Sequence, residues 1–407
     1  MAAAVAYSPH LLLPPPYLLR ASSRSLAVEA LAQVAKEGLS IDDGAIAARS
    51  AALSALGRAA QEGDRAALEV LVAGAKDWHP KVKDAAVQAL AQVVQRGDRK
   101  AVHARLQGAQ ALAPLALFGD ARAVEALAVA LNDEHASIRE AAMGALIRVA
   151  EEGESTAGPL VAARVAALEA LRPAALQGDK RAVQALVRCA KDWHIEVRET
   201  GIEAVAALAE LEAGLGCHAV VVAKVMAIQA LAPAARAGEA RAVRALGAAA
   251  AGGVLQPLPP SSPRGGRARE AVRAFAVEAL AHVVLDGDSA SSSIVSARVG
   301  AVEALCKAVA SATASGGFDM AQRAVGILAK CSSDWQVEVR TAAIAALAEV
   351  ATRGAAPAGA PQEVAAAMAA AHWAAIAALV PAARTGNAQA LAVLTSQEVG
   401  GSGSAAS

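Results

Sequence analysis

The chain has 407 residues, and 38 Lys and Arg residues balance 38 Asp and Glu residues, so the formal net charge is zero. Hydrophobic residues make up 56% of the chain but aromatic residues only 2%, so the apolar mass is mainly Ala, Leu and Val. This composition suits helices and disfavours a β-sandwich or barrel, because strands prefer β-branched and aromatic residues. The balanced charge gives no electrostatic footprint for nucleic acid, and the apolar content excludes disorder over most of the length.

Residues 1–21 are expected to form a disordered or targeting N-terminus. No acidic residue precedes Glu29, while Arg20 and Arg24 are basic, which fits loosely with an organelle transit peptide. Three prolines at 14–16 interrupt the apolar run, so a standard signal peptide is not predicted. Four cysteines without zinc spacing, and no Asn-x-Ser/Thr sequon, fit a reducing compartment. Localisation is therefore cytoplasmic by default, with organelle import as the alternative.

A basic residue recurs along the chain as the anchor of a repeated pattern. Three residues after each anchor comes Ala or Gly, six after comes Ala, and seven after comes Leu or, once, Val205. Positions 0, 3, 4 and 7 share one face of a helix, so each anchor predicts an amphipathic helix. The twelve anchors, all of them Arg or Lys except the last, are Arg24, Arg49, Lys83, Arg105, Arg139, Arg164, Arg198, Lys224, Arg273, Arg298, Arg340 and His372.

Two kinds of repeat alternate. In long repeats Val or Ile precedes the anchor and a second, shorter helix is expected before an Asp turn, whereas in short repeats Ala precedes the anchor. A Gly fourteen residues after ten of the anchors predicts a helix stop, and acidic residues after it suit the start of the next helix. Four short repeats carry a proline at one slot, which we expect to kink the helix without ending it: Pro114, Pro173, Pro233 and Pro381.

The run from Gly178 to Arg198 resembles a HEAT repeat of the phycobilin-lyase type, and so do Gly63 to Ala91 and Gly119 to Leu146. The resemblance implies an Asp six residues before an Arg, the two forming a ladder along the superhelix. The spacing occurs in four pairs: Asp77 with Lys83, Asp133 with Arg139, Asp192 with Arg198, and Asp334 with Arg340. The fifth long repeat departs, because Arg267 stands where the Asp is expected.

The expected fold is all-α: a right-handed, armadillo-like α-solenoid of HEAT-like repeats over residues 22–394. A flexible Pro/Gly/Ser-rich insertion is expected at 252–266, a second loop at 354–361, and a disordered tail at 395–407. Residues 364–383 hold no charge over the length of a membrane span, but they are mainly Ala and keep the repeat register, so no membrane span is predicted. Cys189 and Cys331 each lie three residues before an Asp-Trp pair, at a small packing position that we expect to be buried.

No enzymatic signature is present in the sequence. Phosphate-binding, zinc-protease and serine-hydrolase motifs are absent. Deoxyhypusine hydroxylase, an enzyme built from this type of repeat, binds iron through His-Glu pairs, and none of the eight His residues here is followed by Glu. We therefore predict no catalytic residue, no cofactor and no metal site.

The strongest site candidate is a recurring Asp-Trp-His turn. Its tryptophans and histidines are Trp78, His79, His135, Trp193, His194 and Trp335. A shared metal is disfavoured, because equivalent turns two repeats apart would be on the order of 20 Å apart when packed helices lie about 8–10 Å apart. Two interpretations stay open: these residues close the turn, with Trp packed on the adjacent repeat, or the tryptophans form a row that grips a partner.

The expected function is a non-enzymatic interaction scaffold that binds a protein or peptide. Nucleic acid is not expected as a partner, because the basic anchors are matched by acidic turn residues. The alternative, implied by the resemblance alone, is a phycobilin-lyase-like or chaperone-like factor for pigment proteins.

Overall fold

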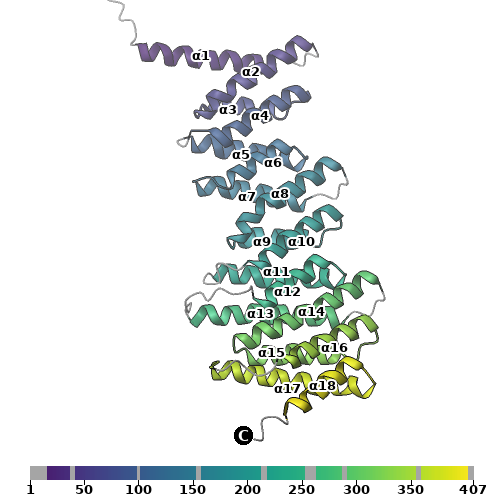
Figure 1. The fold of residues 1–407 in the computed structure, drawn as a ribbon. Coiled ribbons are helices and arrows are strands. Elements are labelled where there is room, and N and C mark those ends of the chain that lie inside the picture. The colour runs from purple at the N-terminus through teal and green to yellow at the C-terminus, as the bar shows by residue number, and fades with distance from the viewer. Residues whose placement is uncertain are drawn as a thin grey trace, which may run out of the picture. The chain divides into compact units, whose positions relative to one another are not determined.

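The computed structural model describes residues 16–36, 42–98, 101–152, 157–211, 218–252, 263–286, 291–353 and 359–401. Every regular element in these ranges is an α-helix, which confirms the predicted all-α class (Figure 1). The helices are α1 Pro16–Lys36, α2 Asp43–Gln61, α3 Arg65–Gly74, α4 Pro80–Arg96, α5 Val102–Leu117, α6 Ala121–Ala130, α7 Ala136–Glu151, α8 Gly158–Leu176, α9 Lys180–Cys189, α10 Ile195–Glu210, α11 His218–Arg236, α12 Ala240–Ala251, α13 Pro263–Leu285, α14 Ser292–Ala314, α15 Phe318–Cys331, α16 Val337–Thr352, α17 Gln362–Arg384 and α18 Ala388–Gly401.

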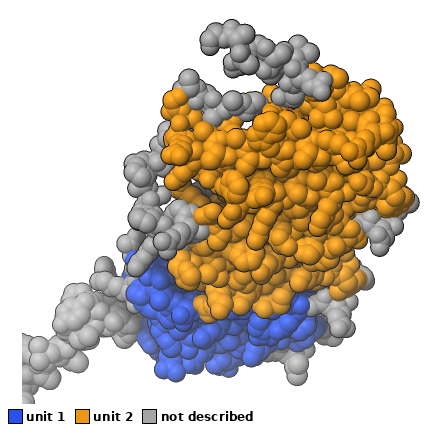
Figure 2. Space-filling view, turned by 90° about the horizontal axis from the view of Figure 1, so that it is seen from below, with its two compact units in different colours: residues 1–167 blue, residues 168–407 orange. Residues whose placement is uncertain are grey.

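The chain forms two compact units, Met1–Ala167 and Leu168–Ser407, coloured separately in Figure 2. Within each unit the described helices pack on helices one, two or three positions away along the chain. In the first unit α4 packs on α2, α3, α5 and α6, and in the second α14 packs on α11, α12, α13, α15, α16 and α17. Packing between sequence neighbours alone is the defining property of a solenoid, and it confirms the predicted α-solenoid.

The repeating element is a group of three helices. Each short repeat supplies one long helix, and each long repeat supplies a shorter middle helix and a second long helix, as in α2–α3–α4 and α14–α15–α16. The middle helices start where the sequence predicts, because Asp64, Asp120 and Asp179 each accept hydrogen bonds from backbone N–H groups of the first helical turn.

The glycine stops divide into two kinds. After the short-repeat helices Gly63, Gly119 and Gly178 take φ values of 95°, 87° and 89°, the left-handed region predicted for them. Gly97, which follows α4, differs: its φ is −57° and its ψ is 148°. There a Cβ atom would lie 2.3 Å from the Val93 carbonyl oxygen, so close backbone approach rather than a left-handed turn requires Gly.

The four prolines lie inside α5, α8, α11 and α17, and each helix continues to the third residue beyond its proline. This confirms that the proline slot does not terminate the helix.

Small residues let the helices approach closely. The Ala six residues after the anchor lies against a neighbouring helix: a Cβ atom added to Gly57 of α2 would lie 3.1 Å from the Ala89 Cβ atom of α4. The Leu one residue later is fully buried, as at Leu90. Cys189 and Cys331 are buried, 2% and 1% exposed, as their spacing predicts.

Three helices extend into segments that were predicted to lie outside the regular solenoid helices. Helix α1 begins at Pro16, inside the predicted N-terminal segment, because a proline in the first turn of a helix loses no hydrogen bond. Helix α13 begins at Pro263, inside the predicted insertion 252–266, for the same reason. Helix α18 runs to Gly401, into the predicted tail, because Gln397 and Glu398 favour helix continuation. Residues 1–15, 253–262, 354–358 and 402–407 of these predicted segments lie outside the described residues.

Two helices, α11 and α17, are long and apolar enough to cross a membrane by length and composition. Helix α17 contains residues 364–383, the uncharged stretch that was weighed above as a membrane span. Helix α11 was not weighed in this way from the sequence. Both pack on neighbouring helices, α11 on α9, α10, α12, α13 and α14, and α17 on α14, α15, α16 and α18. This packing buries 44% of the most apolar stretch of α11 and 22% of that of α17.

We predict that Gly119→Ala and Gly144→Ala shift stability in opposite directions. At Gly119 the left-handed φ is unfavourable for Ala, and a Cβ atom would lie 3.0 Å from the Pro159 carbonyl carbon. We therefore expect Gly119→Ala to lower the free energy of unfolding by about 1–3 kcal/mol. Gly144 lies inside α7, where a Cβ atom meets nothing within 4 Å, so Ala should stabilise by about 0.5–1 kcal/mol. Urea unfolding of the intact chain measures both, and equal effects would contradict the assignment of Gly119 to a left-handed turn.

We also predict that the buried thiols react slowly. Burial raises the pKa of the Cys306 thiol to about 11 and that of Cys331 to about 12, with the Glu349 and Asp334 carboxylates acting in the same direction. At about pH 8 the Cys306 thiolate fraction is then roughly 100-fold lower than for an ordinary thiol. Ellman's reagent, applied to a Cys217→Ser background, should react far faster in urea than with the folded chain. Equal rates would show that these thiols are accessible.

Candidate functional site

Four turns join a middle helix to the following long helix, and we call them the Asp turns: Asp77–His79, Asp133–His135, Asp192–His194 and Asp334–Gln336. In each, the Asp Oδ1 atom accepts a hydrogen bond from the backbone N–H two residues later, over 2.8 to 2.9 Å. This contact fixes the backbone at the residue that precedes the long helix. The Asp turn is therefore a rigid element, built from its own sequence.

The second oxygen of the Asp carboxylate forms a buried ion pair. Its partner is the short-repeat anchor of the preceding long helix: Arg49 pairs with Asp77, Arg105 with Asp133, and Arg298 with Asp334. The Arg side chains are 3 to 7% exposed and the carboxylates 6 to 13%. Buried charges are retained when they are paired, so each pair ties an Asp turn to the helix before it.

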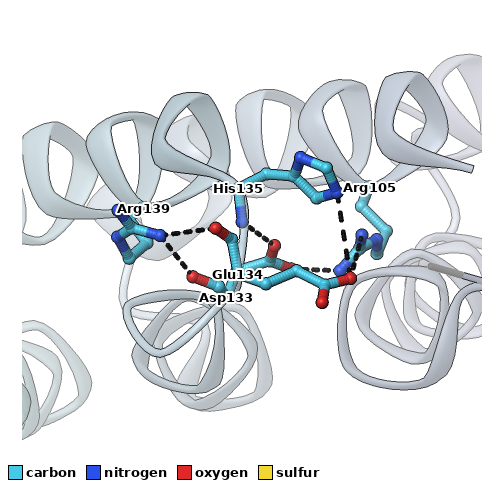
Figure 3. Close-up of polar contacts among 5 residues, drawn as sticks. All are labelled: Arg105, Asp133, Glu134, His135 and Arg139. Carbon is cyan, nitrogen blue, oxygen red and sulfur yellow. Dashed lines mark hydrogen bonds and ion pairs between the residues drawn. The ribbon is translucent and has the colours of Figure 1, made fainter. Parts of the chain in front are cut away.

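The predicted ladder needs a correction. Three long-repeat anchors, Arg139, Arg198 and Arg340, do reach the Asp six residues earlier, but they contact its backbone rather than its carboxylate. Arg139 Nη1 donates to the Asp133 carbonyl oxygen at 2.7 Å and to the Glu134 carbonyl oxygen at 2.8 Å (Figure 3). The carboxylate is directed inward to Arg105, which leaves the carbonyl oxygens as the acceptors on the outer side of the turn.

The same outer contact recurs in the second compact unit. Arg198 Nη1 donates to the Asp192 and Trp193 carbonyl oxygens at 3.1 and 3.3 Å, and Arg340 Nη1 donates to the Asp334 carbonyl oxygen at 2.7 Å. Lys83, the anchor after the Asp77 turn, makes no such bond among the described residues.

The tryptophans of the Asp turns point to solvent. Trp78, Trp193 and Trp335 are 53%, 55% and 60% exposed, so more than half of each residue's surface is accessible to a partner. The Trp78 and His79 rings meet edge to face with centroids 5.3 Å apart. Trp193 and His194 do the same at 5.5 Å.

The histidines lie deeper than the tryptophans. His79, His135 and His194 are half-buried, and each occupies the position before a long helix. In the second compact unit Gln336 takes this position and is buried, and its Oε1 atom accepts a hydrogen bond from Arg298. The residue at this position thus closes the turn, and the tryptophan before it remains accessible.

Sequence reasoning missed two kinds of residue. The buried partners Arg49 and Arg105 lie 28 residues before their Asp, a spacing also present between Arg164 and Asp192 and detectable in the sequence. Two exposed aromatic side chains were also missed: Trp373 in α17, 67% exposed, and Phe118 at the end of α5, 77% exposed. Phe118 could have been found, because the equivalent slot of other short repeats holds no aromatic residue.

Within the described part of the chain, no group of three or more His, Cys, Asp or Glu side chains could hold a metal ion. The ionisable groups of the Asp turns are used in structural ion pairs and hydrogen bonds. What the site offers to a partner is aromatic surface held on fixed backbone.

No protein-family model matches this chain, and no curated protein matches it. Among solved structures, an engineered protein is similar with 21% identity over 90% of this chain and 93% of that chain, at a TM-score of 0.36. Importin beta is similar with 14% identity over 89% of this chain and 53% of that chain, also at a TM-score of 0.36. Both TM-scores are too low to bear on function, and the phycobilin-lyase type of the repeat rests on the sequence resemblance alone.

We predict that Asp133→Ala strongly destabilises the first compact unit. The substitution removes the carboxylate that faces buried Arg105 and the acceptor for the His135 N–H, and breaking a buried pair costs about 3–5 kcal/mol. The control is Glu69→Ala, which breaks an exposed pair with Arg65 and should cost less than about 1 kcal/mol. Urea unfolding followed by circular dichroism measures both. Similar losses would show that the buried pair has no special structural role.

Proposed function

We propose that this chain is a non-enzymatic scaffold that binds a protein or peptide partner through its helical-repeat surface, with the tryptophans of the Asp turns as contact points. The observation that carries the proposal is the exposure of Trp78, Trp193 and Trp335 on turns whose backbone is fixed by hydrogen bonds. The fold does not require aromatic side chains there, because the α6–α7 turn has Glu134 in the same slot.

Rigid display favours binding. Trp is among the residues that contribute most to interface affinity, and a side chain on fixed backbone loses less conformational freedom on association. The edge-on contact of His79 with Trp78, and of His194 with Trp193, limits the tryptophan orientations further. The histidines of the turns, His135 included, therefore serve mainly as supports for the contact surface.

In this proposal the Asp and Arg residues of the predicted ladder have a structural role, separate from partner binding. Asp77, Asp133 and Asp334 use their carboxylates in buried pairs, and Arg139, Arg198 and Arg340 bind turn carbonyl oxygens. These residues keep the turns in place and are not offered to a partner. The bilin-lyase-like alternative has no supporting feature among the described residues.

We predict that a Trp78→Ala, Trp193→Ala, Trp335→Ala triple variant loses partner binding while remaining folded. Each side chain is more than half exposed, so its removal should cost little stability, whereas loss of a binding hot spot weakens affinity about tenfold or more. The measurement is quantitative affinity capture from native extract, followed by titration of the captured partner.

The matched control is Trp373→Ala, which removes an equally exposed tryptophan outside the Asp turns and also breaks an edge-on contact with a histidine. The control should bind like the original chain. If the triple variant captures the partner as well as the original chain does, the tryptophans do not belong to the interface. If no partner binds saturably, the scaffold proposal is overturned.

A further inference from the structure

An open groove in the first compact unit is lined mainly by residues of α3 and of the C-terminal half of α5. Its volume is about 630 Å³, within the range of roughly 300–1,000 Å³ that is typical of binding pockets. Its apolar surface comes from both helices and the residues that follow them: Val72, Ala75, Ala111, Pro114, Leu115 and Phe118.

Phe118 is the feature that the fold does not explain. It follows the last residue of α5 and is 77% exposed, so it contributes little to the core. Phe118 lies thirteen residues after its anchor, Arg105. The other short repeats hold small or polar residues at that distance from their anchors: Glu62, Gln177, Ala237, Ser311 and Thr385. An aromatic side chain at the rim of this one groove is a contact surface without a partner in the described part of the chain.

The polar wall of the groove suits a peptide backbone. Gln107 and Gln110 lie one turn apart on α5 and both line the groove. Neither amide has a hydrogen-bond partner among the described residues. Because each amide offers both a donor and an acceptor, the two can pair with the N–H and C=O groups of an extended segment.

The charges of the groove are unbalanced. Its two carboxylates are already used, since Glu69 pairs with Arg65 at 3.1 Å and Asp77 pairs with buried Arg49. Its two ammonium groups, on Lys76 and Lys83, have no carboxylate within 4 Å in the part of the chain that the structure describes. The two lysines therefore offer positive charges that can pair with the carboxylates of an anionic ligand.

From these observations we propose that the α3–α5 groove binds a short acidic segment of a partner protein. Apolar side chains of that segment contact Phe118 and Pro114, its backbone pairs with the two glutamines, and its carboxylates contact the two lysines. The proposal rests on the proposed scaffold function and names the chemistry of one partner segment. It also gives the first unit a binding surface beside an Asp turn, since Asp77 lines the same groove.

The test starts from a library of short random peptides displayed on phage and selected against the intact chain. We expect the enriched peptides to combine acidic and apolar residues. A labelled consensus peptide should then bind in fluorescence anisotropy, and Lys76→Glu and Phe118→Ser should each weaken it about tenfold or more. Both side chains are exposed, so both variants should fold.

Matched controls lie outside the groove. Lys81→Glu changes an exposed lysine at the start of α4, and Phe318→Ser changes an exposed phenylalanine in the second compact unit. Both should bind the consensus peptide like the original chain. The same peptide should weaken further with added salt, because its carboxylates would contact solvent-exposed lysines.

Three results would overturn the proposal that the groove binds an acidic segment. These are no enriched peptides, enriched peptides without acidic residues, or a consensus peptide that binds the Lys76→Glu and Phe118→Ser variants normally. An oligothymidylate that displaces the peptide and shows the same dependence on Lys76 and Phe118 would assign the groove to nucleic acid instead. If these variants retain peptide binding but the tryptophan triple variant loses its partner, the scaffold proposal stands and the groove proposal fails.

Discussion

The buried pair between a short-repeat Arg and the Asp of the next turn is the interaction on which the repeat geometry depends. One guanidinium joins three elements: Arg298 donates through Nε to the Val284 carbonyl oxygen at the end of α13, pairs with Asp334, and reaches Gln336 before α16. Because a buried Arg that loses its carboxylate is costly, the Asp turn cannot move independently of the helix that carries the Arg. The last helix of one group, the first helix of the next and the following turn are thereby held together.

This arrangement explains why exposed aromatic residues can be displayed without loss of order. The backbone of each Asp turn is held from inside by the carboxylate, and three of the four turns are also held from outside by a long-repeat Arg, as Figure 3 shows for Asp133. The residue after the Asp, such as Trp78 or Trp193, is then free to face solvent. The same buried pairing affects the charge of the α3–α5 groove. Asp77 pairs with Arg49, so the Asp77 carboxylate is not available to Lys76 and Lys83, which also line the groove.

One group departs from the pattern in a consistent way. The long repeat anchored at Arg273 has Arg267 where the Asp is expected, and the buried anchor that precedes it is Lys224 rather than Arg. Arg273, the long-repeat anchor of that group, contacts the Gly252 carbonyl oxygen and the Ser315 hydroxyl instead of turn carbonyl oxygens. Burial and the nearby Arg269 lower the pKa of its guanidinium. Among the buried short-repeat anchors, Arg thus stands where an Asp turn follows, and Lys224 stands where none does.

The sequence by itself determined the repeat, because Ala, Leu and Gly at fixed distances from each anchor define a helical face and a helix end through local geometry alone. It therefore predicted the middle helices, the Asp caps and the burial of Cys189 and Cys331. It could not determine which Arg meets which Asp. A spacing of six residues pointed to Arg139 for Asp133, whereas packing brought Arg105 to the carboxylate from 28 residues away. Nor could it show that Trp78 is exposed or that Phe118 borders a groove, since exposure depends on which helices pass nearby, and only tertiary packing decides that.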